Sequence, residues 1–245
     1  MKTYFISDAH LGSLAFPDSR DKELRLVTFL DSIKHEASAI YMLGDMFDFW
    51  HEWGEVVPKG YTRFLGKLSE LHDIGVDLHY FIGNHDIWAY KYLSEECGVT
   101  LHRDPSTVRI GSLSLYLAHG DGLGDDSHAF HILRGVFHNR LLQWLFRTFI
   151  PVDWAMHFGR QWARHSRLKQ RDETYRGESE EPLVRYAKKY LQKHPDIDIF
   201  IFGHRHIELD LMLSHSSRLI ILGDCFEHYT YGVLDNGRFC LDNYS

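Results

Sequence analysis

The sequence predicts an α/β fold of two stacked β-sheets, mixed in strand direction, with helices on the outer faces and a helical insertion. Three patterns indicate this class. Apolar runs of strand length alternate with amphipathic helices over residues 3–82. Short strands separated by turns follow from residue 197 to residue 241, and the long segment between these parts shows helical spacing.

The first part of the predicted core has a βαβαβ order. Apolar runs predict strands at 3–7, 39–43 and 76–82. Apolar residues three and four positions apart predict helices at 22–34 and 61–74. Because each pair of strands is connected through a helix, we expect the three strands to be parallel, with right-handed crossovers.

The later part of the core is predicted to contain shorter strands joined by turns. Residues Gly111 and Ser112 separate the first two of them, and the sequence Asp235-Asn236-Gly237 is a strong hairpin signal between the last two. The predicted strands are 108–110, 113–118, 197–202, 209–213, 218–222, 231–234 and 238–241.

Between the two core parts lies a predicted helical insertion. We assign residues 1–122 and 194–245 to the core and residues 123–193 to the insertion, which is expected to lie over the functional site as a cap. Large apolar residues recur at helical spacing in it: Phe130, Leu133, Phe137, Leu141, Trp144, Leu145, Phe149, Trp154, Phe158 and Trp162. A basic cluster follows at Arg160, Arg164, Arg167, Lys169 and Arg171.

Composition excludes several classes of protein. The formal charge of -7 argues against a protein that holds nucleic acid through a general positive field. Three cysteines without CxxC spacing, Cys97, Cys225 and Cys240, predict neither a disulfide framework nor a zinc knuckle and fit a reducing compartment. The apolar run at the N-terminus is too short for a signal peptide, and no apolar run approaches the roughly 20 residues that span a bilayer.

Five short polar segments each follow an apolar run, and each offers Asp, Asn or His side chains. One such segment is ordinary turn chemistry, and most of the 18 histidines must have structural roles. Five of them at the carboxyl ends of strands, where ligands gather in open α/β sheets, predict one shared site. The segments are Ser7-Asp8-Ala9-His10, Gly44-Asp45-Met46-Phe47-Asp48, Gly83-Asn84-His85-Asp86, His119-Gly120-Asp121 and Gly203-His204-Arg205-His206.

This set of side chains suits two divalent metal ions that share a carboxylate. One ion is predicted to be held by Asp8, His10, Asp45 and His206, and the other by Asp45, Asn84, His119 and His204. Oxygen and imidazole donors without a thiolate suit Mn²⁺, Fe or Zn²⁺ better than Ca²⁺. A hydroxide between the ions would be the nucleophile in an in-line attack on phosphorus.

Two further residues are candidates for catalysis. His85 belongs to neither predicted ligand set, but it directly follows the ligand Asn84. We therefore expect it to donate to a phosphoryl or leaving-group oxygen. Asp48 lies three residues beyond the bridging carboxylate and is expected either to orient the His85 imidazole or to cap its own loop.

The ordered motifs DxH, GDxxD, GNHD, HGD and GHxH resemble those of the calcineurin-like metallophosphoesterase superfamily. They extend from Asp8 to His206, over most of the chain. The resemblance implies a four-layer α/β/β/α sandwich, and the metal and catalytic roles of that family match the positions assigned above.

Within the superfamily, the size of the chain, the helical insertion after His119-Gly120-Asp121-Gly122-Leu123 and the Trp- and Phe-rich cap followed by Arg-His-Ser-Arg resemble the UDP-2,3-diacylglucosamine diphosphatases of lipid A biosynthesis. That family attacks the α-phosphorus of its lipid-linked nucleotide sugar, usually with Mn²⁺, and yields UMP and 2,3-diacylglucosamine 1-phosphate. It implies a Gram-negative source and a peripheral position on the cytoplasmic face of the inner membrane. Its best-known branch has GNRD, so GNHD with His85 indicates a divergent branch.

The cap is expected to decide specificity. Its apolar residues either pack the insertion onto the core or enclose acyl chains and touch the bilayer, while Arg164, Ser166, Arg167 and Lys169 would meet phosphate or sugar or form a solvated helix face. His204 and Asn84 are also placed to contact substrate. Two alternatives are a metallophosphoesterase for another nucleotide, phosphoprotein or diester and a non-catalytic scaffold, and the complete ligand set argues against the scaffold.

Overall fold

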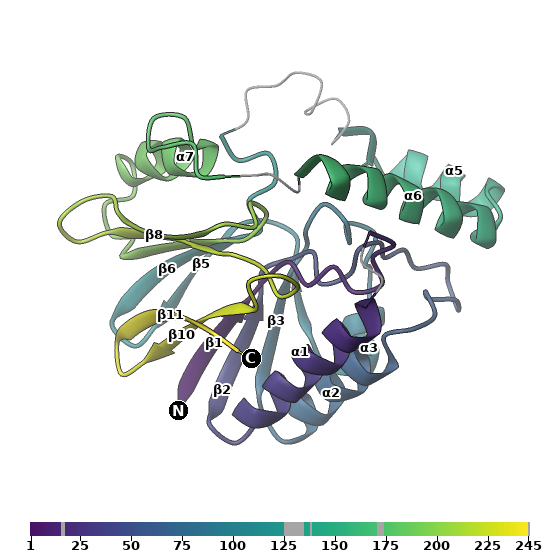
Figure 1. Cartoon of the computed structure of the whole chain (residues 1–245), viewed down its shortest axis with the longest axis horizontal. Helices are drawn as coiled ribbons and strands as arrows, with labels where there is room; N and C mark the ends of the chain where they lie inside the picture. The colour runs from purple at the N-terminus through teal and green to yellow at the C-terminus, as the bar shows by residue number, and fades with distance from the viewer. Residues whose placement is uncertain (16–17, 125–134, 138, 171–173, 245) are drawn as a thin grey trace.

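The computed structural model describes residues 1–15, 18–124, 135–137, 139–170 and 174–244, without the side chains of 167–170. Two β-sheets are stacked on each other, with helices on their outer faces (Figure 1). The six-stranded sheet has the order β11-β10-β1-β2-β3-β4, and the five-stranded sheet has the order β5-β6-β7-β9-β8. These layers confirm the predicted fold class.

The strands of the first sheet are β1 (Lys2–Ile6), β2 (Ala37–Met42), β3 (Asp77–Phe81), β4 (Thr100–His102), β10 (Thr230–Asp235) and β11 (Arg238–Asn243). Those of the second sheet are β5 (Ser106–Ile110), β6 (Leu113–Ala118), β7 (Ile199–Phe202), β8 (Glu208–Met212) and β9 (Arg218–Leu222). The helices are α1 (Ser19–Ile33), α2 (Thr62–Asp73), α3 (Tyr92–Cys97), α5 (Arg140–Phe149), α6 (Val152–Gln170) and α7 (Pro182–Leu191).

Three buried apolar clusters fill the spaces between the four layers, because successive side chains of a strand point to opposite faces. In β1, Tyr4 and Ile6 pack under α1 and α2, whereas Phe5 lies between the sheets. In β7, Ile201 lies between the sheets, and Phe202 packs on the outer face of the second sheet. The strands at the centre of each sheet are therefore apolar on both sides.

Strand directions match the predicted parallel order. Strands β1, β2 and β3 pair in parallel, as do β6, β7 and β9. The predicted hairpin is also present: Asn236 and Gly237 have φ angles of 48° and 78° in the turn between β10 and β11, as a type I′ turn requires. The elements α3 and β4 were not predicted, because six and three residues are too short to show a period.

The helix α7 falls inside the predicted insertion but belongs to the core layers. Its residues Leu183, Val184 and Ala187 are buried in one cluster with β6, β7 and β9. The division at residues 123 and 193 stays a prediction, and we propose that the insertion ends before α7. The apolar residues Phe130 and Leu133 of the predicted cap lie outside the described residues.

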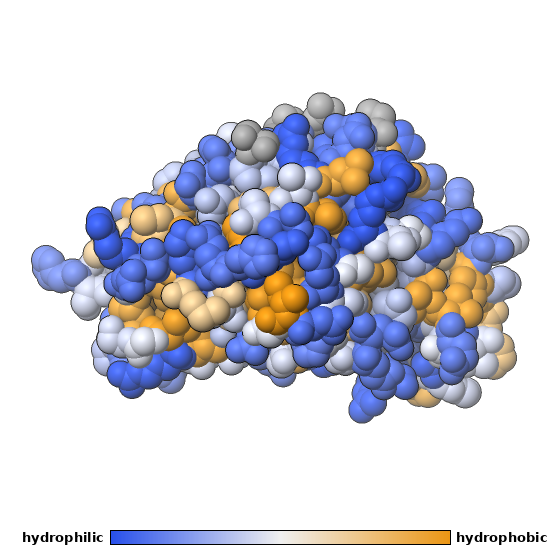
Figure 2. All heavy atoms as spheres, turned by 90° about the horizontal axis from the view of Figure 1, so that it is seen from below, coloured by the Kyte–Doolittle hydropathy of each residue, from blue (hydrophilic) through white to orange (hydrophobic). Residues whose placement is uncertain are grey.

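The helices α5 and α6 project from one end of the two sheets (Figure 1). Large apolar side chains are exposed on both, including Leu141, Phe149 and Trp154. The face shown in Figure 2 is mainly hydrophilic, with separate apolar patches, one of them toward the end of the molecule that carries these two helices. Among the described helices, none combines the length and apolar character that crossing a bilayer requires.

Candidate metal centre

All five polar segments of the predicted site follow strands that run in parallel at the middle of the sheets. Asp8, Asp45 and Asn84 follow β1, β2 and β3, while His119 and His204 follow β6 and β7. Parallel strands end at the same edge of a sheet, and here the two stacked sheets bring both edges together. Side chains separated by as many as 196 positions therefore meet: the His204 amide donates to Asp8 Oδ2 over 2.8 Å.

Five of the predicted ligands have backbone conformations that L-amino acids seldom adopt. The φ angles are 55° for Asp8, 42° for His10, 53° for Asp45, 69° for His204 and 50° for His206. Each left-handed residue other than glycine costs about 1–3 kcal/mol, and such residues cluster at functional sites. The strain turns the side chains toward one another and marks these loops as functional.

Two glycines of the motifs are required by close approach to the site. A Cβ atom on Gly83 would lie 2.2 Å from Asp45 Oδ1, and one on Gly203 would lie 1.9 Å from Ser7 Oγ and 2.5 Å from Asp8 Oδ2. Any side chain at either position would displace a carboxylate. Glycine is therefore required before Asn84 and before His204 by the lack of space for a side chain as well as by turn formation.

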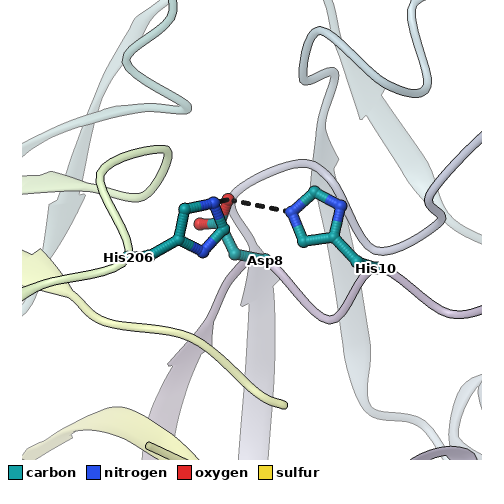
Figure 3. Close-up of side chains that lie close together, drawn as sticks. All are labelled: Asp8, His10 and His206. Atoms are coloured by element: carbon teal, nitrogen blue, oxygen red, sulfur yellow. Dashed lines mark ion pairs between the residues drawn. The ribbon is translucent and has the colours of Figure 1, made fainter. Parts of the chain in front are cut away.

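The first group of ligand atoms comes from Asp8, His10 and His206, whose side chains converge from two loops in Figure 3. Asp8 Oδ1 lies 3.5 Å from His10 Nε2 and 3.6 Å from His206 Nε2. The Phe226 ring packs against both imidazoles, with centroid distances of 5.7 Å to His10 and 5.3 Å to His206. Sequence reasoning missed Phe226, because nothing in its local sequence distinguishes it from a core residue.

The second group comes from Asp45, His119 and His204, with Asn84 beside it. Asp45 Oδ2 lies 3.3 Å from His119 Nε2 and 3.8 Å from His10 Nε2, so one carboxylate lies between the two groups. Asn84 Oδ1 is 3.3 Å from His119 Nε2. His119 Nδ1 donates to the Leu43 carbonyl over 2.7 Å, an outer hydrogen bond of the kind that fixes a metal-binding imidazole.

Within each group the donor atoms lie within 4.8 Å of one another. They are carboxylate oxygens and imidazole nitrogens from side chains that are buried or half-buried. Buried charges are stable only when they are paired or bind metal, so this donor set fits divalent cations. The assignment of each ligand to one of two ions is a proposal developed below.

His85 and Asp48 lie together at the site, but not in the expected way. His85 Nδ1 donates over 2.7 Å to the main-chain carbonyl of Asp48, which leaves Nε2 as the second nitrogen of the ring. The Asp48 carboxylate instead has its Oδ1 3.5 Å from His10 Nδ1. His85 therefore contacts the backbone of Asp48, whereas the Asp48 carboxylate lies beside the predicted ligand His10.

The pKa values of the buried groups show strong coupling between charges. Burial raises the pKa of Asp45, but the positive charges of His119 and His85 outweigh this effect and hold it well below its usual value. Burial, and then the charge of Asp45, raise the pKa of Asp86 to about 7. Burial and the charge of His119 lower the pKa of His204 to about 4.

Asp86 has a structural role that the sequence did not reveal. Its Oδ1 accepts from the Gly83 amide over 2.7 Å, and its Oδ2 accepts from the Met46 amide over 3.2 Å and from the Tyr80 hydroxyl. It therefore joins the loops after β2 and β3, which carry Asp45 and Asn84. The place of Asp86 two residues after Asn84, within the same polar segment, was the available signal for this role.

A mainly apolar cavity of about 210 Å³ opens beside Asn84 and His85, between the core and the helices α5 and α6. Of the cap residues predicted from the sequence, Phe137, Phe158, Trp162 and Ser166 line this cavity. Leu142, Phe146, Ala155 and Ala163, which sequence reasoning did not single out, line it as well.

Other predicted cap residues lie elsewhere. Leu141, Trp144 and Phe149 are exposed on α5 and do not line the cavity. Arg164 is exposed on α6, and the side chains of Arg167 and Lys169, which follow on the same helix, lie outside the described residues.

Comparison with known proteins agrees with this geometry. A family model described as calcineurin-like phosphoesterase matches residues 1–208. A Porphyromonas gingivalis protein named UDP-2,3-diacylglucosamine hydrolase is 38% identical over 99% of this chain and 97% of its own length. A protein of the same name from Edwardsiella ictaluri is 37% identical over 60% of this chain and 55% of its own length, and one from Aeromonas salmonicida is 28% identical over 97% and 91%. The chain therefore belongs to the calcineurin-like phosphoesterase family.

Proposed function

We propose that this chain hydrolyses the pyrophosphate bond of UDP-2,3-diacylglucosamine, releasing UMP and 2,3-diacylglucosamine 1-phosphate. Near-full-length similarity to the Porphyromonas gingivalis hydrolase supports this substrate. A generic phosphoesterase would need the metal ligands but no enclosed apolar space beside them.

The observation that carries the proposal is the cavity beside Asn84 and His85. Its walls are formed by large apolar side chains of α5, α6 and the core, such as Phe49, Phe146 and Trp162. Removing acyl chains from water into such a space is favoured by about 25 cal/mol per Å² of apolar surface. A substrate that places its acyl chains there has its phosphate groups within reach of the candidate metal centre.

For the metal centre we propose the ligand sets predicted from the sequence. Asp8, His10, Asp45 and His206 hold one ion, and Asp45, Asn84, His119 and His204 hold the other. When bound, two divalent ions supply an activated water and neutralise phosphoryl oxygens, and Mn²⁺ is the preferred metal.

His85 has a separate role in this proposal. Its Nδ1 is held by the Asp48 carbonyl, and this bond orients the ring so that Nε2 can donate to a phosphoryl or leaving-group oxygen. Asn84 and His204 contact the phosphate groups from the loops after β3 and β7. Arg164, Ser166, Arg167 and Lys169 of α6 meet the phosphate or sugar.

We further propose that the protein works at the cytoplasmic face of the inner membrane, where a diacyl substrate resides. The exposed Leu141, Phe149 and Trp154 of α5 and α6 support this position, because large apolar side chains gathered at one end of a protein favour contact with a bilayer.

The substrate assignment is tested by Mn²⁺-dependent hydrolysis of three compounds: UDP-2,3-diacylglucosamine, UDP-N-acetylglucosamine and a chromogenic phosphodiester. We expect kcat/KM to be at least about 100-fold higher for the diacyl compound, because only its acyl chains enter the cavity. Equal turnover of all three would favour a general phosphodiesterase, and no turnover of any would favour a scaffold.

Filling the cavity should remove the preference for the diacyl substrate while leaving the candidate metal ligands unchanged. Ala163 is 1% exposed and lines the cavity, so Ala163→Trp should lower kcat/KM for the diacyl substrate about 10- to 100-fold and leave hydrolysis of the chromogenic diester unchanged. Gln161→Trp, on the exposed side of the same helix, is the matched control and should retain both activities. Equal effects of the two variants would contradict a role of the cavity in binding acyl chains.

A further inference from the structure

A second cavity, of about 400 Å³, lies on the adjoining face of α5 and shares Gln143 with the apolar one. On α5 it is lined by Arg140, Gln143, Trp144 and Arg147, which are spaced three and four residues apart and so share one helix face. The core side is formed by Glu52, Gly54, Tyr90 and Lys91. Neither the metal centre nor the cavity for acyl chains uses this space.

The charge of this second cavity is positive. Glu52, the one acidic residue among the described residues that line it, accepts hydrogen bonds from the amides of Tyr90, Lys91 and Tyr92 over 2.9–3.2 Å and from Trp50 Nε1 over 3.3 Å. These donors satisfy both Glu52 oxygens from within the core.

The two arginines that line the cavity are available to attract an anion from outside the protein. Lys91 pairs with the exposed Glu95 over 3.2 Å, whereas Arg140 and Arg147 form no ion pair with a carboxylate in the described part of the chain. Arg147 also acts on a buried group. Burial, and then the positive charge of Arg147, lower the pKa of His51 to about 4. Two arginines beside a half-exposed tryptophan thus face solvent across the cavity.

Exposed apolar side chains lie on another face of the same helix. Leu141 is 63% exposed, Leu145 is 37% exposed and Phe149 is 69% exposed. They follow Arg140 and alternate with Trp144 and Arg147 along α5. A helix that combines exposed apolar residues, a tryptophan and arginines has the character of a segment that lies in the interface of a membrane.

We propose that the cavity between α5 and the segment 90–91 binds the phosphate of an anionic phospholipid headgroup. Arg140 and Arg147 contact the phosphate, Trp144 lies at the level of the headgroups, and Leu141, Leu145 and Phe149 enter the acyl region. This inference rests on the proposed function only in taking the membrane as the place where the substrate is met.

The overall charge explains why a dedicated site is needed. With a formal charge of -7, the protein as a whole is repelled by an anionic membrane surface. Two arginines held on one helix face supply local attraction against this net charge. Because α5 also lines the acyl cavity through Leu142 and Phe146, lipid bound at its basic face would set that cavity against the bilayer.

The experiment measures binding of the full-length, Mn²⁺-loaded protein to vesicles of phosphatidylcholine with or without phosphatidylglycerol. Each arginine near an anionic surface adds enough attraction that the double variant Arg140→Gln/Arg147→Gln should bind phosphatidylglycerol vesicles about 30-fold more weakly than the unchanged protein. The matched control Arg109→Gln/Arg238→Gln makes the same change in net charge on the exposed strands β5 and β11, and it should bind like the unchanged protein.

Hydrolysis of detergent-dispersed substrate separates this inference from the proposed function. We expect the Arg140/Arg147 double variant to keep its detergent-phase kcat/KM, which also shows that it is folded. Equal loss of vesicle binding in both double variants would mean that binding depends only on the net charge of the protein. That result would overturn the proposed phosphate site. If inorganic phosphate competed for the site as effectively as a short-chain phosphatidylglycerol, the choice of a lipid as ligand would be overturned. Failure of the proposed function would instead appear as no hydrolysis by the unchanged protein.

Discussion

Asp45→Asn should lower Mn²⁺-dependent hydrolysis by at least about 10³-fold and reduce the number of bound metal ions per chain. Asp45 groups with His119 and His204 and also with His10 and His85 as candidate ligands, and its Oδ2 lies 3.3 Å from His119 Nε2 and 3.8 Å from His10 Nε2. An asparagine keeps the size of the side chain but offers one neutral oxygen in place of two that share a negative charge. Loss of an interaction with developing charge at an active site costs about 10²- to 10³-fold, and loss of a shared metal ligand affects both ions.

The measurement pairs turnover with metal content by elemental analysis. Asp104→Asn, in an exposed loop, makes the same chemical change away from the site and should leave both quantities unaltered. Melting temperatures of the two variants without metal would show whether each is folded. An Asp45→Asn protein that retained full metal content and full turnover would refute a bridging role.

Glu181→Gln should lower the free energy of unfolding by about 3–5 kcal/mol, because it breaks a buried ion pair. Arg205 Nε donates to Glu181 Oε1 over 2.7 Å, and Arg205 Nη2 donates to Oε2 over 3.2 Å. The side chains are 7% and 0% exposed. Removing the charge of one partner leaves the other buried without its counterion, and this costs more than the loss of an exposed pair.

The position of this pair gives it a second expected effect. Arg205 lies between His204 and His206, and Glu181 immediately precedes α7, where the chain returns to the core. The pair thus holds the loop that carries two candidate ligands. We expect Glu181→Gln to weaken Mn²⁺ binding about 10- to 100-fold, as the loss of an outer contact to metal ligands does elsewhere.

A matched control lies three residues away. Glu178 pairs with Lys188 over 2.6 Å, but both side chains are exposed, at 53% and 42%. Glu178→Gln should change the free energy of unfolding by less than about 1 kcal/mol and leave metal affinity unchanged. Chemical denaturation and metal titration of both variants provide the comparison, and equal behaviour would show that Glu181 has no special role.

The chain's local pattern was sufficient to predict the layers and the strand ends at which the candidate ligands lie. A continuous apolar run such as 199–202 indicates a strand that is buried on both faces, and the parallel order of the first three strands follows from the helices between them. Motifs placed at strand ends then predicted which side chains converge, because the carboxyl ends of parallel strands share an edge. Short elements such as α3 and β4 were missed for lack of a period.

The sequence alone thus determined the class of fold, the positions of the polar segments and the convergence of their side chains at one edge of the sheets. Only the tertiary structure decided which atom of Asp48 holds His85, that α7 covers the second sheet, and that Glu181 pairs with Arg205. It also revealed the left-handed backbone of five candidate ligands and the two cavities on adjoining faces of α5. Periodicity reports which face of an element is buried, whereas these features depend on where separate elements meet and how their side chains are turned.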